Sequence, residues 1–327
     1  MVTQFACEPA SEASILDLPC QTGPMPSATR TALGAAGSLL AVGAATTAYS
    51  LWEARQYTLR RVVVQLRRPS DRSGASLPPL RILHLSDLHL SPRDTDRMAW
   101  VRSLGALDVD LTVVTGDFNG DARGPELALT ALDPLFDRPG LFVRGSNDYF
   151  APARANPAKY LSGPSELRTH RPRIDLAPLN EGLAAAGWHD LDNEKAEVTV
   201  RGWRIDARGV DDPHIGRDRY ADVAGPFDPV ADLRLGVAHA PYRRVLDAMA
   251  ADGSDLILAG HTHGGQVCLP WVGALVTNCD LPRSQAKGLS GWREAALHVS
   301  AGLGTSPYTP IRLACRPEAT VLTVVAA

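Results

Sequence analysis

Short runs of apolar residues alternate with amphipathic stretches along most of this chain. Runs typical of buried strands lie at 81–86, 110–115, 141–144, 233–237, 255–259, 298–301 and 319–325. Helical spacing of apolar residues occurs in 94–107, 125–136, 180–187 and the stretch that ends at Met249. Residues 58–67 and 197–209 alternate between apolar and polar, which indicates an edge strand and antiparallel strands. This order of strands and helices predicts an α/β fold, in which binding sites gather at the carboxyl ends of the strands.

The N-terminal part of the chain differs in composition from the rest. Residues 1–30 are rich in Pro, Ser, Thr and Ala without apolar periodicity, so we predict that they are disordered. Residues 31–52 contain no charged residue and match the roughly 20 residues that a membrane-spanning helix needs. A membrane anchor, a cleaved export signal and a buried helix all fit this segment, and we favour a single-pass anchor because few basic residues precede it. Residues 53–79 would then form a juxtamembrane strand and linker, and 80–327 the main domain.

Composition narrows the partners that this chain can have. Of its 327 residues, 45% are hydrophobic and 21% are charged, which is ordinary for a globular protein. The net charge of -3 includes no basic excess, so we do not expect nucleic acid as a partner. The five cysteines follow no disulfide or zinc-thiolate spacing. We expect free thiols, with a single Cys268–Cys279 bridge as the alternative.

Polar side chains that can bind a metal ion follow five of the predicted strands. They are Asp87, His89, Asp117, Ser146, Asn147, Asp148, His239, His261 and His263. Glycine or proline adjoins these clusters, and glycine lets the backbone approach a ligand closely. One Asp-x-His pair alone is as easily explained by two solvated residues at a strand end. Five clusters of oxygen and imidazole ligands, however, are enough for two divalent metal ions with open coordination positions.

The order of these clusters resembles that of the calcineurin-like metallophosphoesterases, in particular their bacterial, membrane-associated branch. The matching motifs are SDLH (86–89), TGD (115–117), GSND (145–148), AHAP (238–241) and GHTHGGQ (260–266). The resemblance implies a four-layer α/β/β/α sandwich, preceded here by the apolar, transmembrane or signal-like helix. The side of the membrane stays open, because the arginines after residue 52 favour the cytoplasm whereas relatives in this branch are often exported.

The resemblance also implies a site with two divalent metal ions. Its ligands would be Asp87, His89 and His263 for one ion, Asn147, His239 and His261 for the other, and Asp117 as the bridge. This mixture of nitrogen and oxygen ligands suits Mn, Fe or Zn. The implied reaction is hydrolysis of a phosphomonoester or phosphodiester by direct attack of metal-bound hydroxide. Because of the apolar N-terminal segment, we include lipid-linked esters among the substrates.

The chain departs from the family pattern at residues 145–148. Where the family has Gly-Asn-His-Asp this chain has Gly-Ser-Asn-Asp, so the histidine that protonates the leaving group is missing. Either Ser146 takes the ligand position, or Asn147 reaches the metal through a shifted loop. We favour Asn147, because an amide carbonyl binds a hard cation better than a neutral hydroxyl does. We assign catalytic roles to Asn147, Asp148 and His214, with His214 as a replacement proton donor.

Further residues near the motifs are candidates for binding the substrate. Arg144, Tyr149 and Gln266 flank the metal ligands in the sequence, and Tyr149 and Gln266 fit a packing role equally well. Residues 150–178 form a loop long enough to be a lid or a flexible insertion, and His170 within it is another candidate proton donor.

Two other functions fit the same sequence. The missing histidine favours a metal-binding membrane scaffold that has lost its catalytic activity. A protein phosphatase of the same fold is the other alternative, which the apolar N-terminal segment disfavours. Hydrolysis of an activated phosphate ester would distinguish the enzyme from the scaffold.

Overall fold

The structure is a computed structural model that describes residues 27–66, 77–152, 171–305 and 308–326. Disorder was predicted for residues 1–30: residues 1–26 lie outside the described residues, whereas 27–30 are the first turn of a helix. Most of the predicted linker and His170 also lie outside the described residues. The chain divides into two units, residues 1–46 and 47–327, and the second contains all of the sheets.

Helix α1 (Ser27–Glu53) includes the apolar segment predicted at 31–52. Across the described ranges, no helix combines the length and the apolarity that crossing a membrane requires. The structure thus does not show the membrane-spanning helix that the sequence predicted at 31–52. The end of α1, from Thr47 onward, belongs to the second unit, and within that unit Ser50 O accepts a hydrogen bond from Arg312 N (3.0 Å) and Glu53 Oε2 accepts one from Ala314 N (2.8 Å).

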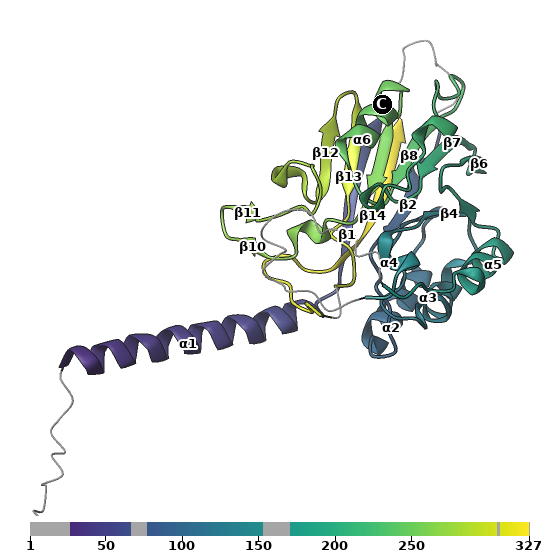
Figure 1. The fold of residues 1–327 in the computed structure, drawn as a ribbon. Helices are drawn as coiled ribbons and strands as arrows, with labels where there is room; N and C mark the ends of the chain where they lie inside the picture. Colours follow the sequence, from purple (N-terminus) through teal and green to yellow (C-terminus); the bar gives the residue numbers. More distant parts are fainter. Residues whose placement is uncertain (1–26, 67–76, 153–170, 306–307, 327) are drawn as a thin grey trace, which may run out of the picture. The chain divides into compact units, whose positions relative to one another are not determined.

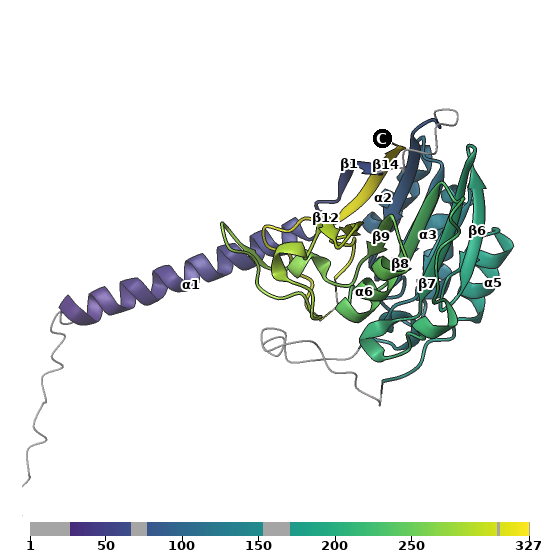
Figure 2. The same ribbon diagram turned by 90° about the horizontal axis from the view of Figure 1, so that it is seen from above.

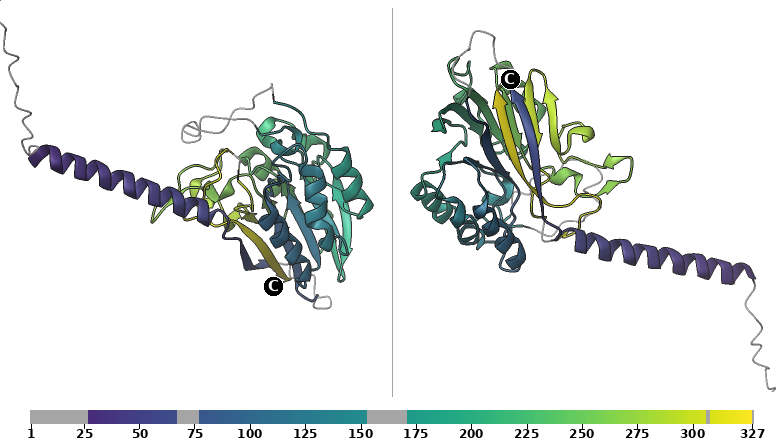
Figure 3. Two further views of the ribbon diagram at one scale, coloured as in Figure 1. Left: turned by 90° about the horizontal axis from the view of Figure 1, so that it is seen from below. Right: turned by 180° about the vertical axis from the view of Figure 1, so that it is seen from behind.

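The first of two mixed six-stranded sheets has the order β1-β14-β2-β3-β4-β5. Its strands are β1 (Thr58–Leu66), β2 (Leu80–Leu85), β3 (Leu111–Thr115), β4 (Gly140–Val143), β5 (His189–Asp190) and β14 (Glu318–Ala326). Strands β2 to β5 are mutually parallel, and β14 runs antiparallel to β2. The predicted edge strand at 58–67 is confirmed: β1 lies beside β14 at the edge of the sheet (Figure 3).

The second sheet has the order β12-β13-β9-β8-β7-β6. Its strands are β6 (Lys195–Val200), β7 (Trp203–Val210), β8 (Leu233–Ala238), β9 (Leu256–Ala259), β12 (Gly288–Trp292) and β13 (Ala295–Val299). Strands β7, β8, β9 and β13 are parallel, and the two edge strands are antiparallel to their neighbours. A separate short hairpin consists of β10 (Cys268–Leu269) and β11 (Gly273–Ala274).

Helices cover the outer faces of the two sheets (Figures 1 and 2). They are α2 (Thr95–Ser103), α3 (Gly124–Leu132) and α5 (Ala177–Ala185) on the first sheet, and α6 (Arg243–Ala251) on the second. A further short helix, α4 (Ser146–Tyr149), follows β4. Single 3-10 turns include η4 (Pro213–Ile215) and η6 (His263–Gly265).

The main core lies between the sheets. Leu80, Ile82 and Val113 of the first sheet pack in one buried cluster with Leu235 and Leu258 of the second. Two further clusters join each sheet to its own helices. The order of layers is therefore helix, sheet, sheet, helix, which confirms the predicted α/β class. Strands β2, β3 and β4 are parallel to one another, as are β8 and β9. The polar residues that follow their carboxyl ends therefore lie at the same end of each sheet.

Candidate metal centre

The loops that follow β2, β3, β4, β8 and β9 contact one another, although they come from two different sheets. The backbone N–H of His261 donates to Asp87 Oδ2 (3.0 Å), which joins the loop after β9 to the loop after β2. His239 Nδ1 lies 2.7 Å from the carbonyl oxygen of Thr115, which joins the loop after β8 to β3. Within the described residues, two groups offer ligand atoms within 4.8 Å of one another: Asp87, His89 and His263, and Asp87, Asp117 and His239.

The first group has the chemistry of a cation site. His89 Nε2 and His263 Nε2 face each other at 3.3 Å, and Asp87 Oδ1 lies 3.6 Å from His263 Nε2 and 4.0 Å from His89 Nε2. Asp87 Oδ1 is buried and has no hydrogen-bond partner. A buried carboxylate oxygen is normally paired, so an unpaired one that faces two imidazole nitrogens fits a bound cation.

Asp117 belongs to the second group and also approaches a ligand of the first. Its Oδ2 atom is 3.4 Å from His89 Nε2 and 3.5 Å from His239 Nε2. A bridging carboxylate requires this kind of position, so the geometry agrees with the bridging role expected for Asp117. His239 Nε2 is itself buried and unpaired, whereas its Nδ1 is oriented by Thr115. This is the usual arrangement of a metal-binding histidine, whose second ring nitrogen donates to a backbone carbonyl.

His261 belongs to neither of the two groups but lies beside the second. Its ring centroid is 5.1 Å from that of His239 and 4.5 Å from that of His214. The Nε2 atom of His261 lies 3.1 Å from the carbonyl oxygen of Asn278. The predicted ligand His261 is thus close to the site, with one ring nitrogen already engaged.

The site keeps most of its imidazoles neutral. Burial lowers the pKa of His89 to about 4, and burial also holds the pKa values of His261 and His263 well below the usual range. Burial alone would lower the pKa of His239 too, but the neighbouring carboxylate of Asp117 outweighs it and raises that pKa. Neutral imidazoles and ionised carboxylates are the forms that bind divalent cations.

Five of the predicted ligands have left-handed backbone conformations. The φ angles are 51° for Asp87, 43° for His89, 55° for Asp117, 68° for His261 and 49° for His263. Non-glycine residues rarely adopt these angles, and such outliers gather at functional sites where the surrounding structure enforces them. These five residues follow only three strands, β2, β3 and β9, and their concentration there supports a functional role for the cluster independently of the side-chain distances.

The glycine of the GSND motif is required by close packing. A Cβ atom at Gly145 would lie 2.6 Å from His239 Nε2 and nearer still to Asp117 Oδ1. Any side chain here would therefore displace two of the predicted ligands, one of them the expected bridge.

Asn147 contacts the centre directly. Its backbone N–H donates to Asp117 Oδ1 (2.8 Å), and its amide Nδ2 donates to Asp117 Oδ2 (2.8 Å). These contacts hold the amide nitrogen of Asn147 against Asp117, whereas its Oδ1, the atom that would bind a cation, accepts a hydrogen bond from Arg171 (3.0 Å). They do not decide between Asn147 and Ser146 as the ligand. The choice between the two residues stays a prediction.

Asp148 supports the backbone of the site. Its Oδ2 accepts hydrogen bonds from the backbone N–H groups of Asp117 and Gly145 (both 2.9 Å), and its Oδ1 accepts one from Asn119 N (3.1 Å). The side chain is completely buried beneath the loops after β3 and β4. Asp148, which the sequence suggested as a catalytic residue, therefore acts here as a positioning residue.

His214 is brought to the site by the 3-10 turn η4. Its backbone N–H donates to Asp212 Oδ1 (2.8 Å), which caps the turn, and its Nδ1 lies 3.1 Å from the hydroxyl of Tyr242. Burial lowers the pKa of His214 to about 4, and the charge of His239 adds to this effect. The predicted proton donor thus lies next to the predicted ligand His261.

Arg171 is a site residue that the sequence did not reveal. Its Nη2 atom donates to Asn147 Oδ1 (3.0 Å) and to Phe150 O (3.2 Å), and its Nε donates to Ala151 O (2.9 Å). The contact forms because the chain returns to Asn147 at a residue that lies 24 positions later in the sequence. No motif surrounds Arg171, so only its basic character offered a signal.

The three predicted substrate-binding residues are engaged elsewhere. Arg144 donates to Asp192 Oδ2 (2.5 Å), Asn180 Oδ1 (2.6 Å) and Asp190 Oδ2 (2.7 Å). The hydroxyl of Tyr149 is 2.9 Å from Asp211 Oδ1, and Gln266 Nε2 donates to Thr309 O (2.8 Å) and Ile311 O (3.0 Å). Because protein groups already pair with these polar atoms, the contacts indicate structural roles and do not support substrate binding by Arg144, Tyr149 or Gln266.

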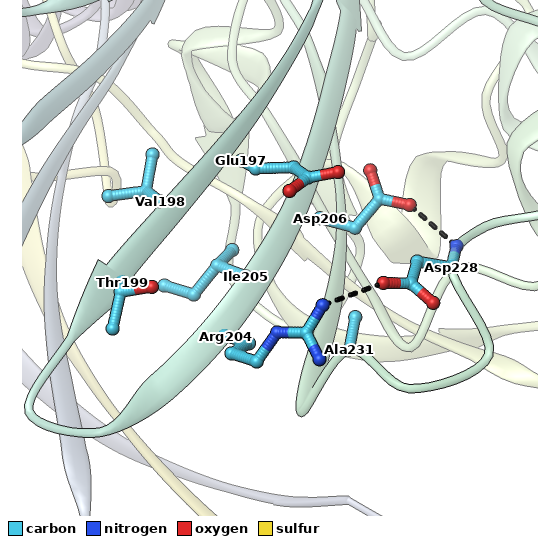
Figure 4. A pocket seen from close by; sticks show the side chains of 8 residues that line it. All are labelled: Glu197, Val198, Thr199, Arg204, Ile205, Asp206, Asp228 and Ala231. Atoms are coloured by element: carbon cyan, nitrogen blue, oxygen red, sulfur yellow. Dashed lines mark hydrogen bonds and ion pairs between the residues drawn. The ribbon is translucent and has the colours of Figure 1, made fainter.

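A small hollow elsewhere on the surface does not belong to this centre. It lies on β6 and β7 and is lined by Glu197, Asp206 and Asp228, among others (Figure 4). Arg204 Nη2 donates to Asp228 Oδ2 (3.1 Å), and Asp228 N donates to Asp206 Oδ2 (2.7 Å). Internal pairs thus satisfy these polar groups, and none of the strand-end ligands lines the hollow.

Comparison with known proteins agrees with this geometry. The sequence model of the calcineurin-like phosphoesterase family matches residues 80–265. The "Uncharacterized metallophosphoesterase YkuE" of Bacillus subtilis (strain 168) is 36% identical over 75% of this chain and 78% of its own length. "Phosphodiesterase YaeI" of Escherichia coli (strain K12) is 27% identical over 76% and 83%, respectively. The "Transmembrane protein with metallophosphoesterase domain" of Bos taurus is 30% identical over 81% of this chain but only 57% of its own length.

We predict that Asp148→Asn weakens Mn²⁺ binding about 10- to 100-fold, a typical effect of losing the support around a metal ligand. The amide keeps one acceptor oxygen, so at least one of the three backbone N–H groups would face an NH₂ group. Isothermal titration calorimetry with the full chain measures the affinity. Asp108→Asn is the matched control, because the Asp108 side chain is 80% exposed. Equal affinity in both variants would contradict the positioning role.

Proposed function

The chain belongs to the calcineurin-like phosphoesterase family and is a metallophosphoesterase, and we propose that it hydrolyses phosphodiesters at a centre with two divalent cations. The observation that supports this most is the position of Asp117, whose Oδ2 lies between His89 and His239 while Asp87 is shared by both ligand groups. A diester is the first substrate class to test, because the relative from Escherichia coli is named a phosphodiesterase. Phosphomonoesters, including lipid-linked ones, are the second class.

The residues of the centre suit Mn, Fe or Zn. His89 and His263 with Asp87 would hold one cation, and His239, His261 and Asn147 the other, with Asp117 between them. Two such cations, when bound, lower the pKa of a water molecule and neutralise the phosphoryl oxygens of an in-line displacement. The unpaired Asp87 Oδ1 and His239 Nε2 atoms are the observations that make the residues fit these ions.

Arg171 and His214 are the residues that would contact the ester itself. The guanidinium of Arg171 is 3.0 Å from Asn147 Oδ1, so a phosphoryl group at the second ligand group would lie within its reach. A planar guanidinium binds phosphoryl oxygens through paired hydrogen bonds. His214, beside His261, would donate a proton to the departing oxygen. The negative charge of a bound ester favours the protonated imidazole and so opposes the effect of burial.

We predict that the purified full-length protein hydrolyses bis-p-nitrophenyl phosphate in the presence of Mn²⁺, and that Asp117→Asn reduces the rate to background. The substitution removes one oxygen acceptor from the position between His89 and His239. Release of p-nitrophenol measures the rate, and Asp108→Asn serves as the control for purification and folding. If metal-loaded protein hydrolyses no activated ester, the non-catalytic scaffold is the better description. A panel of phosphopeptides tests the protein-phosphatase alternative.

The roles of Arg171 and His214 predict different dependences on the leaving group. His214→Gln should slow the hydrolysis of diphenyl phosphate, whose phenolate is a poor leaving group, by about 10²- to 10⁴-fold. It should slow the hydrolysis of bis-p-nitrophenyl phosphate far less, since p-nitrophenolate is a good leaving group and needs no proton. Arg171→Gln should instead raise KM for both esters by similar factors. Steady-state kinetics on both substrates separates the two patterns. Arg173→Gln is the control for Arg171, because Arg173 is exposed two positions away. Equal effects of His214→Gln on the two esters would exclude it as the proton donor.

We also propose that the protein associates with membranes through the end of α1. The side chains of Tyr49, Leu51 and Trp52 are 46%, 44% and 50% exposed, and Arg55 follows them. Aromatic and basic residues of this kind favour the membrane interface. The name of the relative from Bos taurus offers weak further support.

Flotation of the full-length protein with vesicles that contain anionic lipid tests this association. We expect the protein to float with the vesicles and the double variant Tyr49→Ser, Trp52→Ser to float less. Val63→Ser, at a 58% exposed position in β1, is the matched control. Wild-type protein that stays at the bottom of the gradient with every lipid composition would contradict the proposal.

A further inference from the structure

Two buried cysteines lie directly behind the turn that contains His263. Cys268 begins β10, and Cys315 precedes β14; they are 5% and 1% exposed and share one small cluster with three alanines. Both are free thiols, as the sequence predicted. The alternative bridge between Cys268 and Cys279 is absent, because Cys279 packs in a different cluster, under α6. The neighbour of Cys268 is instead Cys315.

The two sulfur atoms share a hydrogen-bond acceptor. Cys268 Sγ donates to the carbonyl oxygen of Gly264 (3.3 Å), and Cys315 Sγ is 3.5 Å from the same oxygen. The backbones are also tied, because Cys268 N donates to Leu313 O (2.8 Å). The thiols therefore approach the same point from two segments that are already joined by a backbone hydrogen bond.

We propose that Cys268 and Cys315 are an oxidation site, at which a hydroperoxide or a small-molecule disulfide converts the two thiols into a disulfide. Both S–H bonds break and one S–S bond forms. The two protons and two electrons pass to the oxidant, so that a hydroperoxide becomes an alcohol and water, and a disulfide becomes two thiols. A thiol reductant reverses the step by thiol–disulfide exchange.

The surroundings of Cys315 favour this reaction. Lys287 Nζ lies 3.5 Å from Cys315 Sγ, and Arg312 Nη1 lies 3.9 Å from it. Both cationic groups contact the sulfur and so restrict its position beside Cys268. The hairpin that covers the pair has strands of only two residues each, β10 and β11, so few backbone hydrogen bonds oppose its opening to a small oxidant.

Oxidation at this site would reach the metal centre through His263. Cys315 Sγ donates to His263 O (3.3 Å), and Gly264, with φ of +62°, has so little room that a Cβ atom there would lie 2.7 Å from Cys315 Sγ. A disulfide consumes both S–H donors and moves Cys315 Sγ against this turn. We therefore expect oxidation to displace His263 and to weaken cation binding by Asp87, His89 and His263, an effect that rests on the proposed function of that group.

The experiment treats the full-length protein with hydrogen peroxide, blocks free thiols with N-ethylmaleimide and maps disulfide-linked tryptic peptides by mass spectrometry. Because Cys268 and Cys279 lie in one tryptic peptide, the Cys279→Ser variant identifies the partner of Cys315. We expect the link to Cys315 in wild type and Cys279→Ser, its loss in Cys268→Ala, and its reversal by dithiothreitol. Absence of the link in Cys279→Ser, at peroxide levels that oxidise the half-buried Met98, would overturn the proposal.

Measuring Mn²⁺ binding by the wild-type protein after oxidation and after re-reduction tests whether the disulfide affects the metal centre. We expect at least a tenfold loss of affinity after oxidation, recovery after reduction, and no loss in Cys268→Ala treated with peroxide. A disulfide that leaves Mn²⁺ affinity unchanged would overturn the coupling to His263. Detection of the disulfide does not depend on hydrolytic activity, so a failure of the proposed function and a failure of this inference give different results.

Discussion

Two buried carboxylates, Asp87 and Asp117, are the constraint on which the rest of the structure depends. Both are almost fully buried, and the imidazoles that surround them are neutral apart from His239. Burying ionised carboxylates without compensation is costly, and burial accordingly raises the pKa of Asp87 to about 6, with the nearby charge of Asp117 adding to the effect. Bound divalent cations would relieve this cost directly. The same cations would supply the proposed hydrolytic chemistry, so the residues that are costly to bury are also the ones that the proposed function needs.

The two sheets are joined by side chains of the same strands that lead to Asp87 and Asp117. The buried pair His84 and His298 connects β2 with β13 through an Nδ1–Nδ1 contact of 2.9 Å, and His84 Nε2 lies 2.9 Å from Thr115 Oγ1. Thr115 in turn orients the predicted ligand His239 through its carbonyl oxygen. Movement of one sheet against the other would therefore disturb a ligand. The left-handed angles at five residues after β2, β3 and β9 have the same implication, because strained backbone persists only where its surroundings are fixed.

Much of this arrangement was predictable from the sequence, for a physical reason. Strands such as β2 and β9 are buried on both faces, so their sequences are continuous apolar runs that end abruptly in ligands. Strand β12 and the hairpin β10–β11 gave no such signal, because they are short and partly exposed. The uncharged stretch at 31–52 predicted the helix α1, but whether it crosses a membrane stays a prediction. The role predicted for Arg144 stays a prediction, because adjacency to a motif says nothing about direction, and successive residues of an extended chain point to opposite sides.

Arg312 shows why the remaining contacts could not be found in the sequence. It is completely buried, and its Nη2 atom donates to Ala301 O (2.7 Å), Gly304 O (2.8 Å) and Gly302 O (3.0 Å). Gly302 and Gly304 pack against Asp87 and His89, whereas Arg312 Nη1 lies 3.5 Å from His263 O. One buried cation thus links both sides of the first ligand group, although burial lowers its own pKa. No motif surrounds Arg312, because its partners are backbone carbonyls, which every sequence supplies. The thiol of Cys315 adjoins this same cation, so the proposed oxidation would act on the segment that holds the two sides of the centre together.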